Sequence, residues 1–247
     1  MKKIYLLMTF MMMMVACNSK SVTDPEGVDT FKTKSGKKVV FTCIKHGSIR
    51  ITFDGKEIEV DPVTKIPVVT DYKTFPKADY IFVTHEHGDH FDKQAIEDLW
   101  QTSTKLVTNN RCAEQLGYGT VMANGDVLDL AENIKVEAVP AYNNTPGREK
   151  FHPKGRDNGF ILTLDGFRVY IAGDTEDIPE MENIKDIDVA FLPCNQPYTM
   201  LPTQLAHAVQ MIQPKVVFPY HYSDTNMEEV KALLKDVKVD LRIRNYQ

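Results

Sequence analysis

Three histidines and one aspartate stand within a single six-residue segment, from His85 to His90, which reads His-Glu-His-Gly-Asp-His. Imidazole nitrogens and carboxylate oxygens are ligands for Zn²⁺ and similar divalent cations. The whole chain of 247 residues has only seven histidines, so an ordinary polar surface turn is a poor explanation for this density. The segment therefore predicts a metal site.

The backbone before and inside this segment decides where its ligands point. Residues 78–84 are mostly apolar and predict a short buried strand. His85 and His87, two positions apart in extended chain, would face the same side. Glu86 would point away from them, and we expect it to support the fold rather than to act as a base. The glycine that follows permits a sharp turn, so the last two residues of the segment can serve a second position beside the first.

An HxHxDH motif after an apolar strand resembles the signature of the metallo-β-lactamase superfamily, and the resemblance spans about residues 38–247. Three further residues match the motifs of that superfamily in the right order: Asp61, Asp174 and His221. The resemblance implies that Asp61 supports the site without binding metal, that Asp174 bridges two metals, and that His221 binds the second metal.

One position departs from the superfamily pattern. Asn143 stands where a third histidine for the first metal is expected. Asparagine is a weak ligand for Zn²⁺, whereas His152 in the following loop could replace the missing histidine. That loop, residues 142–158, is long, polar and rich in proline and glycine, as a lid over a site would be. The sequence leaves both residues open as candidates.

The resemblance implies two divalent cations, with zinc first and manganese or iron as alternatives. The expected ligands are His85, His87 and either His152 or Asn143 for the first metal, Asp89, His90 and His221 for the second, and Asp174 between them. A metal-bound hydroxide would attack the substrate, and Asp89 would orient it. Tyr198 is a candidate contact for the oxyanion or the substrate, with packing inside its own loop as the alternative.

The rest of the sequence is similar to one branch of zinc-dependent hydrolases. It resembles the L-ascorbate-6-phosphate lactonase group and, more distantly, N-acyl-phosphatidylethanolamine-hydrolysing phospholipase D, for example in His46-Gly47-Ser48 and Pro197-Tyr198-Thr199. We therefore expect a hydrolase that acts on an ester, lactone or phosphodiester bond of a small-molecule or lipid-like substrate. His46 would stand beside the site or on the surface at a strand end.

Three other functions compete with this one. A metal- or ligand-binding lipoprotein of the same fold without turnover is the alternative from another class, because the third histidine is missing from its usual place. A β-lactamase is disfavoured because the resemblance is to a different branch. A diiron flavoprotein is disfavoured because no flavin-binding domain is present.

The remaining sequence predicts an α/β protein. Apolar or alternating segments predict strands at 39–44, 49–53, 57–60 and 78–84 and, later, at 134–140, 159–164, 168–172, 188–192, 215–218 and 239–243. Helical spacing appears at 93–101, 203–212 and 227–234. This order is compatible with two mixed sheets packed face to face. The superfamily resemblance implies the four-layer αββα sandwich, in a hydrolase domain over residues 31–247.

The N-terminus predicts export and anchoring. Two lysines precede an apolar run, residues 4–15, that is too short to span a bilayer and is typical of a secretory signal. Ala16-Cys17 then resembles a bacterial lipobox, although an ordinary cleaved signal is the alternative. We expect a lipoprotein signal peptide at 1–16, lipidation at Cys17 and a flexible tether at 17–30. These features predict a membrane partner through the lipid anchor, on the outer membrane facing the periplasm of a bacterial cell envelope.

Charge and cysteine content narrow the class of partner. The net charge is −5 and becomes −7 once the signal segment with Lys2 and Lys3 is removed, which argues against nucleic acid as a general partner. Three cysteines follow Cys17, without a CxxC spacing, so they cannot all pair with one another. The sequence indicates no oligomeric state.

Overall fold

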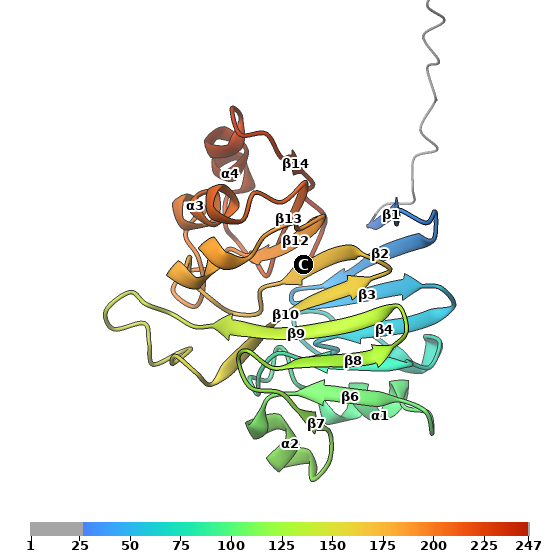
Figure 1. Cartoon of the computed structure of the whole chain (residues 1–247). Coiled ribbons are helices and arrows are strands. Elements are labelled where there is room, and N and C mark those ends of the chain that lie inside the picture. Colours follow the sequence, from blue (N-terminus) through green and yellow to red (C-terminus); the bar gives the residue numbers. More distant parts are fainter. Residues whose placement is uncertain (1–26, 247) are drawn as a thin grey trace, which may run out of the picture.

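The computed structural model describes residues 27–246 and forms two mixed sheets that pack face to face. In Figure 1 the strands of the second sheet, yellow-green to orange, lie in front of those of the first sheet, blue to green. The first sheet has the spatial order β1 (Val28–Lys32), β2 (Lys38–Lys45), β3 (Ser48–Phe53), β4 (Lys56–Val60), β5 (Tyr80–Val83), β6 (Lys105–Thr108) and β7 (Thr120–Val121). Strands β1 to β4 are antiparallel, and β4 to β7 are parallel.

The second sheet repeats this design in the opposite chain order. Its spatial order is β14 (Asp240–Leu241), β13 (Val216–Tyr220), β12 (Val189–Pro193), β11 (Phe167–Ile171), β10 (Asp157–Leu164), β9 (Ile134–Ala141) and β8 (Val127–Ala131). Strands β8 to β11 are antiparallel, and β11 to β14 are parallel. In each sheet the parallel strands therefore end at one edge, where their following loops can meet.

Apolar side chains fill the space between the sheets. Alternation along β2 turns Phe41 inward, where its ring lies 5.4 Å from that of Phe191 on β12. Phe191 in turn stacks on Phe218 of β13 at 5.0 Å. The central strands β5, β12 and β13 are buried on both faces, which explains their unbroken apolar sequences.

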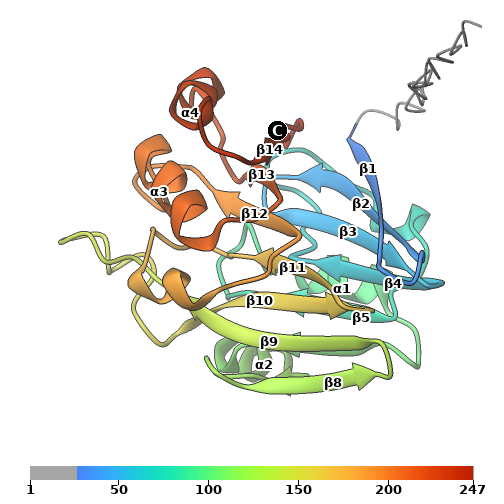
Figure 2. The ribbon, with the colours of Figure 1, turned by 45° about the horizontal axis from the view of Figure 1, so that its top comes forward.

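Helices cover the outer faces of both sheets (Figure 1 and Figure 2). The first sheet carries η1 (Tyr72–Thr74), α1 (Lys93–Leu99) and α2 (Asn110–Leu116), and the second carries η2 (Pro179–Asn183), α3 (Pro202–Ile212) and α4 (Met227–Leu234). The Asp92 side chain caps α1, as its position before the helix suggests, by accepting a hydrogen bond from the Gln94 N–H. The predicted four-layer αββα sandwich is confirmed.

Two expected boundaries need correction. Strand β1 begins at Val28, inside the range 17–30 that we expected to be a flexible tether, so the folded domain starts at residue 28 rather than 31. The C-terminal strand expected over 239–243 is reduced to the two residues of β14. The expected signal peptide and Cys17 lie outside the described residues. Within the described part of the chain, no helix is long and apolar enough to cross a membrane.

Candidate metal centre

The predicted ligands converge where the parallel strands of both sheets end. β4 and β5 are neighbouring parallel strands, so Asp61 after β4 lies beside Thr84 after β5. The Asp61 carboxylate accepts hydrogen bonds from the Thr84 N–H at 2.8 Å and the Thr84 hydroxyl at 2.7 Å. On the second sheet, Asp174 follows β11 and His221 follows β13 at the corresponding edge. The two edges face each other across the sandwich.

His85, His87 and His152 form the first half of the centre, with their ligand nitrogens within 4.8 Å of one another. His152 comes from the loop of residues 142–158, and its backbone carbonyl accepts a hydrogen bond from the Asn143 N–H at 2.8 Å. The Asn143 side-chain amide donates to the Tyr198 carbonyl at 2.7 Å, while its buried oxygen has no hydrogen-bond partner within residues 27–246. Of the two candidates that the sequence leaves open, the fold brings His152 to the histidine pair.

Asp89, His90, His221 and His46 form the second half of the centre, again with ligand atoms within 4.8 Å. The Asp89 carboxylate lies 3.1 Å from His46 Nε2 and 3.4 Å from His221 Nε2. His46 therefore stands beside the site, one of the two positions that the sequence left open for it. Its place at the end of β2, before a glycine, was the signal in the sequence.

Asp174 lies between the two halves and is almost fully buried. One carboxylate oxygen is 3.3 Å from His152 Nε2, 3.4 Å from His221 Nε2 and 3.9 Å from His85 Nε2. The other oxygen is 3.3 Å from His90 Nε2. This is the placement that the predicted bridging role requires.

Several of these atoms are buried without a hydrogen-bond partner among residues 27–246. They are His85 Nε2, His90 Nε2, both ring nitrogens of His221, and Asp174 Oδ1. Buried polar atoms in folded proteins nearly always have a partner. Apart from His221 Nδ1, these atoms are imidazole Nε2 nitrogens and a carboxylate oxygen that lie close to other proposed ligands, so the residues fit divalent cations.

Neighbouring side chains fix the rings so that Nε2 faces the centre. His90 Nδ1 lies 2.8 Å from the Asp61 carboxylate, and His152 Nδ1 lies 3.0 Å from the Asp157 carboxylate. Arg156 pairs with Asp157 in turn at 2.6 Å. A carboxylate behind a ligating imidazole is the usual support of metal-binding histidines, so Asp61 stands in the supporting place expected for it.

The charges of the centre suit a cation. Burial lowers the pKa of His85 well below its usual value, and the charge on His90 acts in the same direction. For His90, burial is outweighed by the carboxylates of Asp174 and Asp89, and its pKa is raised well above the usual value. Burial would raise the pKa of Asp174, yet His221 and His90 hold it well below its usual range. The carboxylates are therefore ionised, and a bound cation would take the place of the His90 proton.

The remaining candidates lie around the centre rather than in it. The ring of Tyr198 is about half exposed and packs edge-on against Phe151, the neighbour of His152, at 5.0 Å. Glu86 accepts a hydrogen bond from Asn109 at 3.3 Å and pairs with Arg111 and Arg156, the kind of contacts expected for a supporting residue. His207, in α3, is exposed and pairs with Asp177.

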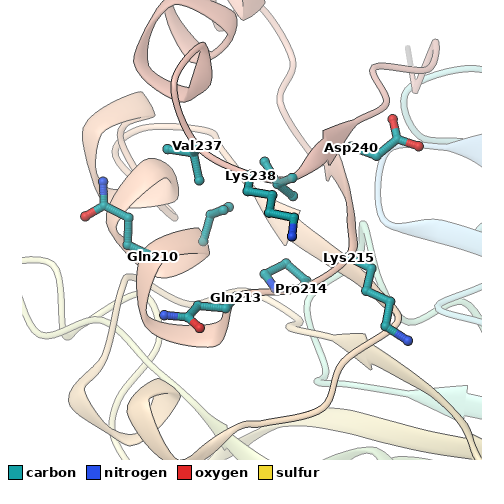
Figure 3. Close-up of a pocket in the computed structure, with 9 residues that line it drawn as sticks. Gln210, Gln213, Pro214, Lys215, Val237, Lys238 and Asp240 are labelled. Atoms are coloured by element: carbon teal, nitrogen blue, oxygen red, sulfur yellow. The ribbon is translucent and has the colours of Figure 1, made fainter.

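A large hollow of the surface lies away from this centre. Figure 3 shows a cavity of about 800 Å³ between the end of α3 and the segment before β14, lined by residues such as Gln213, Lys215 and Lys238. It lies at the opposite end of β13 from His221. Its lining has amides, lysines and one carboxylate but no histidine or cysteine, so it lacks the ligands of a metal site.

Comparison with known proteins agrees with the geometry. A family model described as a beta-lactamase superfamily domain matches residues 41–221. A UPF0173 metal-dependent hydrolase of Thermococcus onnurineus is 32% identical over 73% of this chain and 86% of its own length. A crystal structure from Parabacteroides distasonis, which carries the name of a metal-dependent hydrolase, is 56% identical over 89% of this chain and 99% of that one, with a TM-score of 0.87.

A more distant crystal structure extends the same likeness. The metallo hydrolase of Ignicoccus hospitalis is 27% identical, covers 84% of this chain and 95% of that one, and has a TM-score of 0.72. Together with the histidine and aspartate groups at the shared edge of the two sheets, these matches assign the family. The chain belongs to the UPF0173 metal-dependent hydrolases of the metallo-β-lactamase superfamily.

Proposed function

We propose that this metal-dependent hydrolase cleaves an ester, lactone or phosphodiester bond and works with two divalent cations, Zn²⁺ first among them. The observation that carries the proposal is the pair of ligand groups that share Asp174. The seven side chains proposed as ligands are His85, His87, His152, Asp89, His90, His221 and Asp174. Divalent cations in such a centre lower the pKa of a coordinated water and polarise the bond under attack.

The chain's own residues would orient the reactants. The Asp89 side chain is about one-third exposed, whereas those of His85, His90, His152 and Asp174 are almost fully buried. Asp89 is the partly exposed carboxylate among the proposed ligands, and His87 is the partly exposed histidine; we assign to Asp89 the orientation of the attacking water. The Tyr198 hydroxyl, on the loop bound by Asn143, would donate a hydrogen bond to the developing oxyanion or to the substrate.

The surroundings of the centre favour a substrate with an apolar part. Phe151 and Tyr198 form an aromatic pair next to His152, and Leu201 on the same loop as Tyr198 is exposed. Such a wall accepts an acyl chain or a ring more readily than a highly charged polymer. A small-molecule or lipid-like ester, lactone or phosphodiester would fit it.

Metal analysis followed by a substrate panel tests this function. We expect about two metal ions per chain after loading with Zn²⁺ or Mn²⁺, and hydrolysis of at least one class among phosphodiesters, lactones and N-acyl phospholipids. Tyr198→Phe should lower kcat/KM by about 100-fold and leave the metal content unchanged. A chain that binds no metal would overturn the proposal, and metal binding without turnover on the whole panel would favour the metal-binding lipoprotein.

The cellular place is a separate proposal that rests on the N-terminal sequence. Cleavage after Ala16 and acylation of Cys17 would anchor the hydrolase to the outer membrane, facing the periplasm. Labelling with a radioactive fatty acid, together with membrane fractionation, tests it. Cys17→Ala should abolish the label and move the protein to the soluble fraction, and a labelled Cys17→Ala chain would show that the anchor is elsewhere.

A further inference from the structure

The turn between β2 and β3 contacts the second half of the centre through three consecutive residues. His46 Nε2 lies 3.1 Å from the Asp89 carboxylate, and the His46 ring lies 3.7 Å from the His221 ring, centroid to centroid. The His46 carbonyl also accepts a hydrogen bond from the His221 N–H at 3.0 Å. One residue therefore contacts both the side chain of one proposed ligand and the backbone of another.

The next two residues of the turn contact the remaining members. A Cβ atom on Gly47 would lie 2.7 Å from Cε1 of His90, so the His90 ring packs directly against the glycine backbone. The Ser48 hydroxyl donates to the Asp61 carbonyl at 2.6 Å. Asp61 in turn supports His90. We call residues 46–48 the platform, because they contact Asp89, His90 and His221.

The C-terminal strap, which we define as residues 242–246, holds this platform in place. The Tyr246 carbonyl accepts a hydrogen bond from the His46 N–H. The Tyr246 side chain is buried, and its ring lies 6.2 Å from that of Tyr220, the residue before His221. In both ribbon views the C-terminal end lies near β2 and β13 (Figure 1 and Figure 2).

Charged contacts fix the strap to both sheets. Arg242 and Arg244 bind the buried Asp29 carboxylate of β1 at 2.8 and 2.6 Å. The Arg242 N–H donates to the Val217 carbonyl of β13 at 2.9 Å, and the Tyr222 hydroxyl donates to the Arg244 carbonyl at 2.6 Å. The strap therefore fixes the distance between the end of β2 and the end of β13, which is the distance that separates His46 from His221.

We propose that His46 is a positioning residue for the second half of the centre, set in place by the C-terminal strap. It holds the Asp89 carboxylate and the His221 backbone so that these two groups meet His90 at one cation. This role rests on the proposed function, because it concerns how well the second cation is bound. Loss of an outer contact of this kind costs about 10- to 100-fold in metal affinity.

The affinity of the second metal, measured by competition with a chelator, tests the proposal without any substrate. His46→Ala should weaken the second metal by about 10- to 100-fold and leave the first unchanged. His46→Gln should restore most of the affinity, because its amide can still donate a hydrogen bond to Asp89. His207→Ala, at an exposed histidine that pairs with Asp177, is the matched control and should behave as the wild type.

A truncation tests the strap. A chain that ends at Asn245 lacks the Tyr246 carbonyl and ring, and should lose affinity for the second metal as His46→Ala does. A chain that ends at Tyr246 serves as the control. If the shorter chain unfolds, Tyr222→Phe replaces it, because it removes the hydrogen bond that holds the Arg244 carbonyl of the strap and should weaken the same metal.

The outcomes separate this proposal from the function itself. A wild-type chain that binds no metal would overturn the proposed function. A wild-type chain with two metals, together with a His46→Ala chain that binds both equally well, would overturn only the role of His46. A His46→Gln chain as weak as His46→Ala would also overturn it, because it would make His46 a direct ligand.

Discussion

The two halves of the centre differ in how the fold supports them. The first half takes two histidines from one strand end and its third, His152, from a loop that Asp157 and Asn143 hold. The second half takes residues from the ends of β2 and β13 and from the motif, and the C-terminal strap binds those elements together. A shared motif thus serves one half that depends on a loop and another that is fixed between two sheets. We expect substitutions to weaken metal binding more easily in the first half than in the second.

The largest effect should come from Asp174, which belongs to both halves. Asp174→Asn removes the negative charge that faces His152 and His221 on one side and His90 on the other. Both metals should bind more weakly, and kcat/KM should fall by more than about 100-fold, the upper end for loss of an outer contact. Metal content and rate on the best substrate measure this. Two tightly bound metals in the variant would show that the halves are independent.

A second prediction tests metal binding in each half of the centre separately. His152→Ala should cost the first metal and leave the affinity for the second within a factor of about two, because His46, Asp89 and His221 keep their contacts. His221→Ala should do the reverse. Titration of the metal-free variants with Zn²⁺ measures both. Unchanged metal content in His152→Ala would mean that the loop histidine is not a ligand.

Substitution of the carboxylates that contact the Nδ1 atoms of the histidines should have the next smaller effect on metal affinity. Asp157→Asn weakens the contact to His152 Nδ1 and should reduce affinity for the first metal by about 10- to 100-fold. Asp61→Asn is its counterpart at His90 and should act on the second metal. Asp61 also accepts two hydrogen bonds from Thr84, and Asp157 accepts two from Arg156, so the two losses should be of similar size. Loss of the same metal in both variants would contradict the assignment of one carboxylate to each half.

Asn143→Ala tests whether the loop shapes the substrate site. The variant loses the hydrogen bond to the Tyr198 carbonyl, which costs about 1 kcal/mol of stability, and it frees two loops beside the first half. We expect KM to rise several-fold, with metal content unchanged. If the variant instead loses one metal, Asn143 is a ligand of the first metal.

A substitution of Glu59 tests the stability of the fold without changing either half of the metal centre. Burial raises the pKa of Glu59, next to the supporting strand end at Asp61, to about 8 from an ordinary value of 4.5. The folded chain then keeps a proton that the unfolded chain has lost, so the free energy of unfolding falls as pH rises between these values. Glu59→Gln should remove this slope and stabilise the fold at pH 8 by on the order of 4 kcal/mol.

Thermal unfolding between pH 5 and 8 measures this last effect, with metal content as the control. The wild type should lose stability relative to the variant as pH rises, and both should bind the same amount of metal. Parallel stability curves for the two proteins would show that Glu59 keeps no proton in the fold.

The sequence alone determined where most strands lie and that one short motif carries metal ligands. It could do so because these features are local: the side chains of a strand alternate between two faces, and the motif places its ligands within six positions of a strand end. The sandwich of two mixed sheets and the expected roles of Asp61, Asp174 and His221 came from the resemblance to the superfamily. Asp61 directly follows β4, Asp174 comes three residues after β11, and parallel strands end at one edge.

Only the tertiary structure showed that His152 lies with His85 and His87, and that His46 lies beside Asp89 and His221. It also showed that β1 and the C-terminal strap belong to the folded body. These features depend on the path of loops and on contacts between residues far apart in the chain, such as Asp29 with Arg244. Loops carry no periodic pattern that fixes their course, because packing against the rest of the fold sets it.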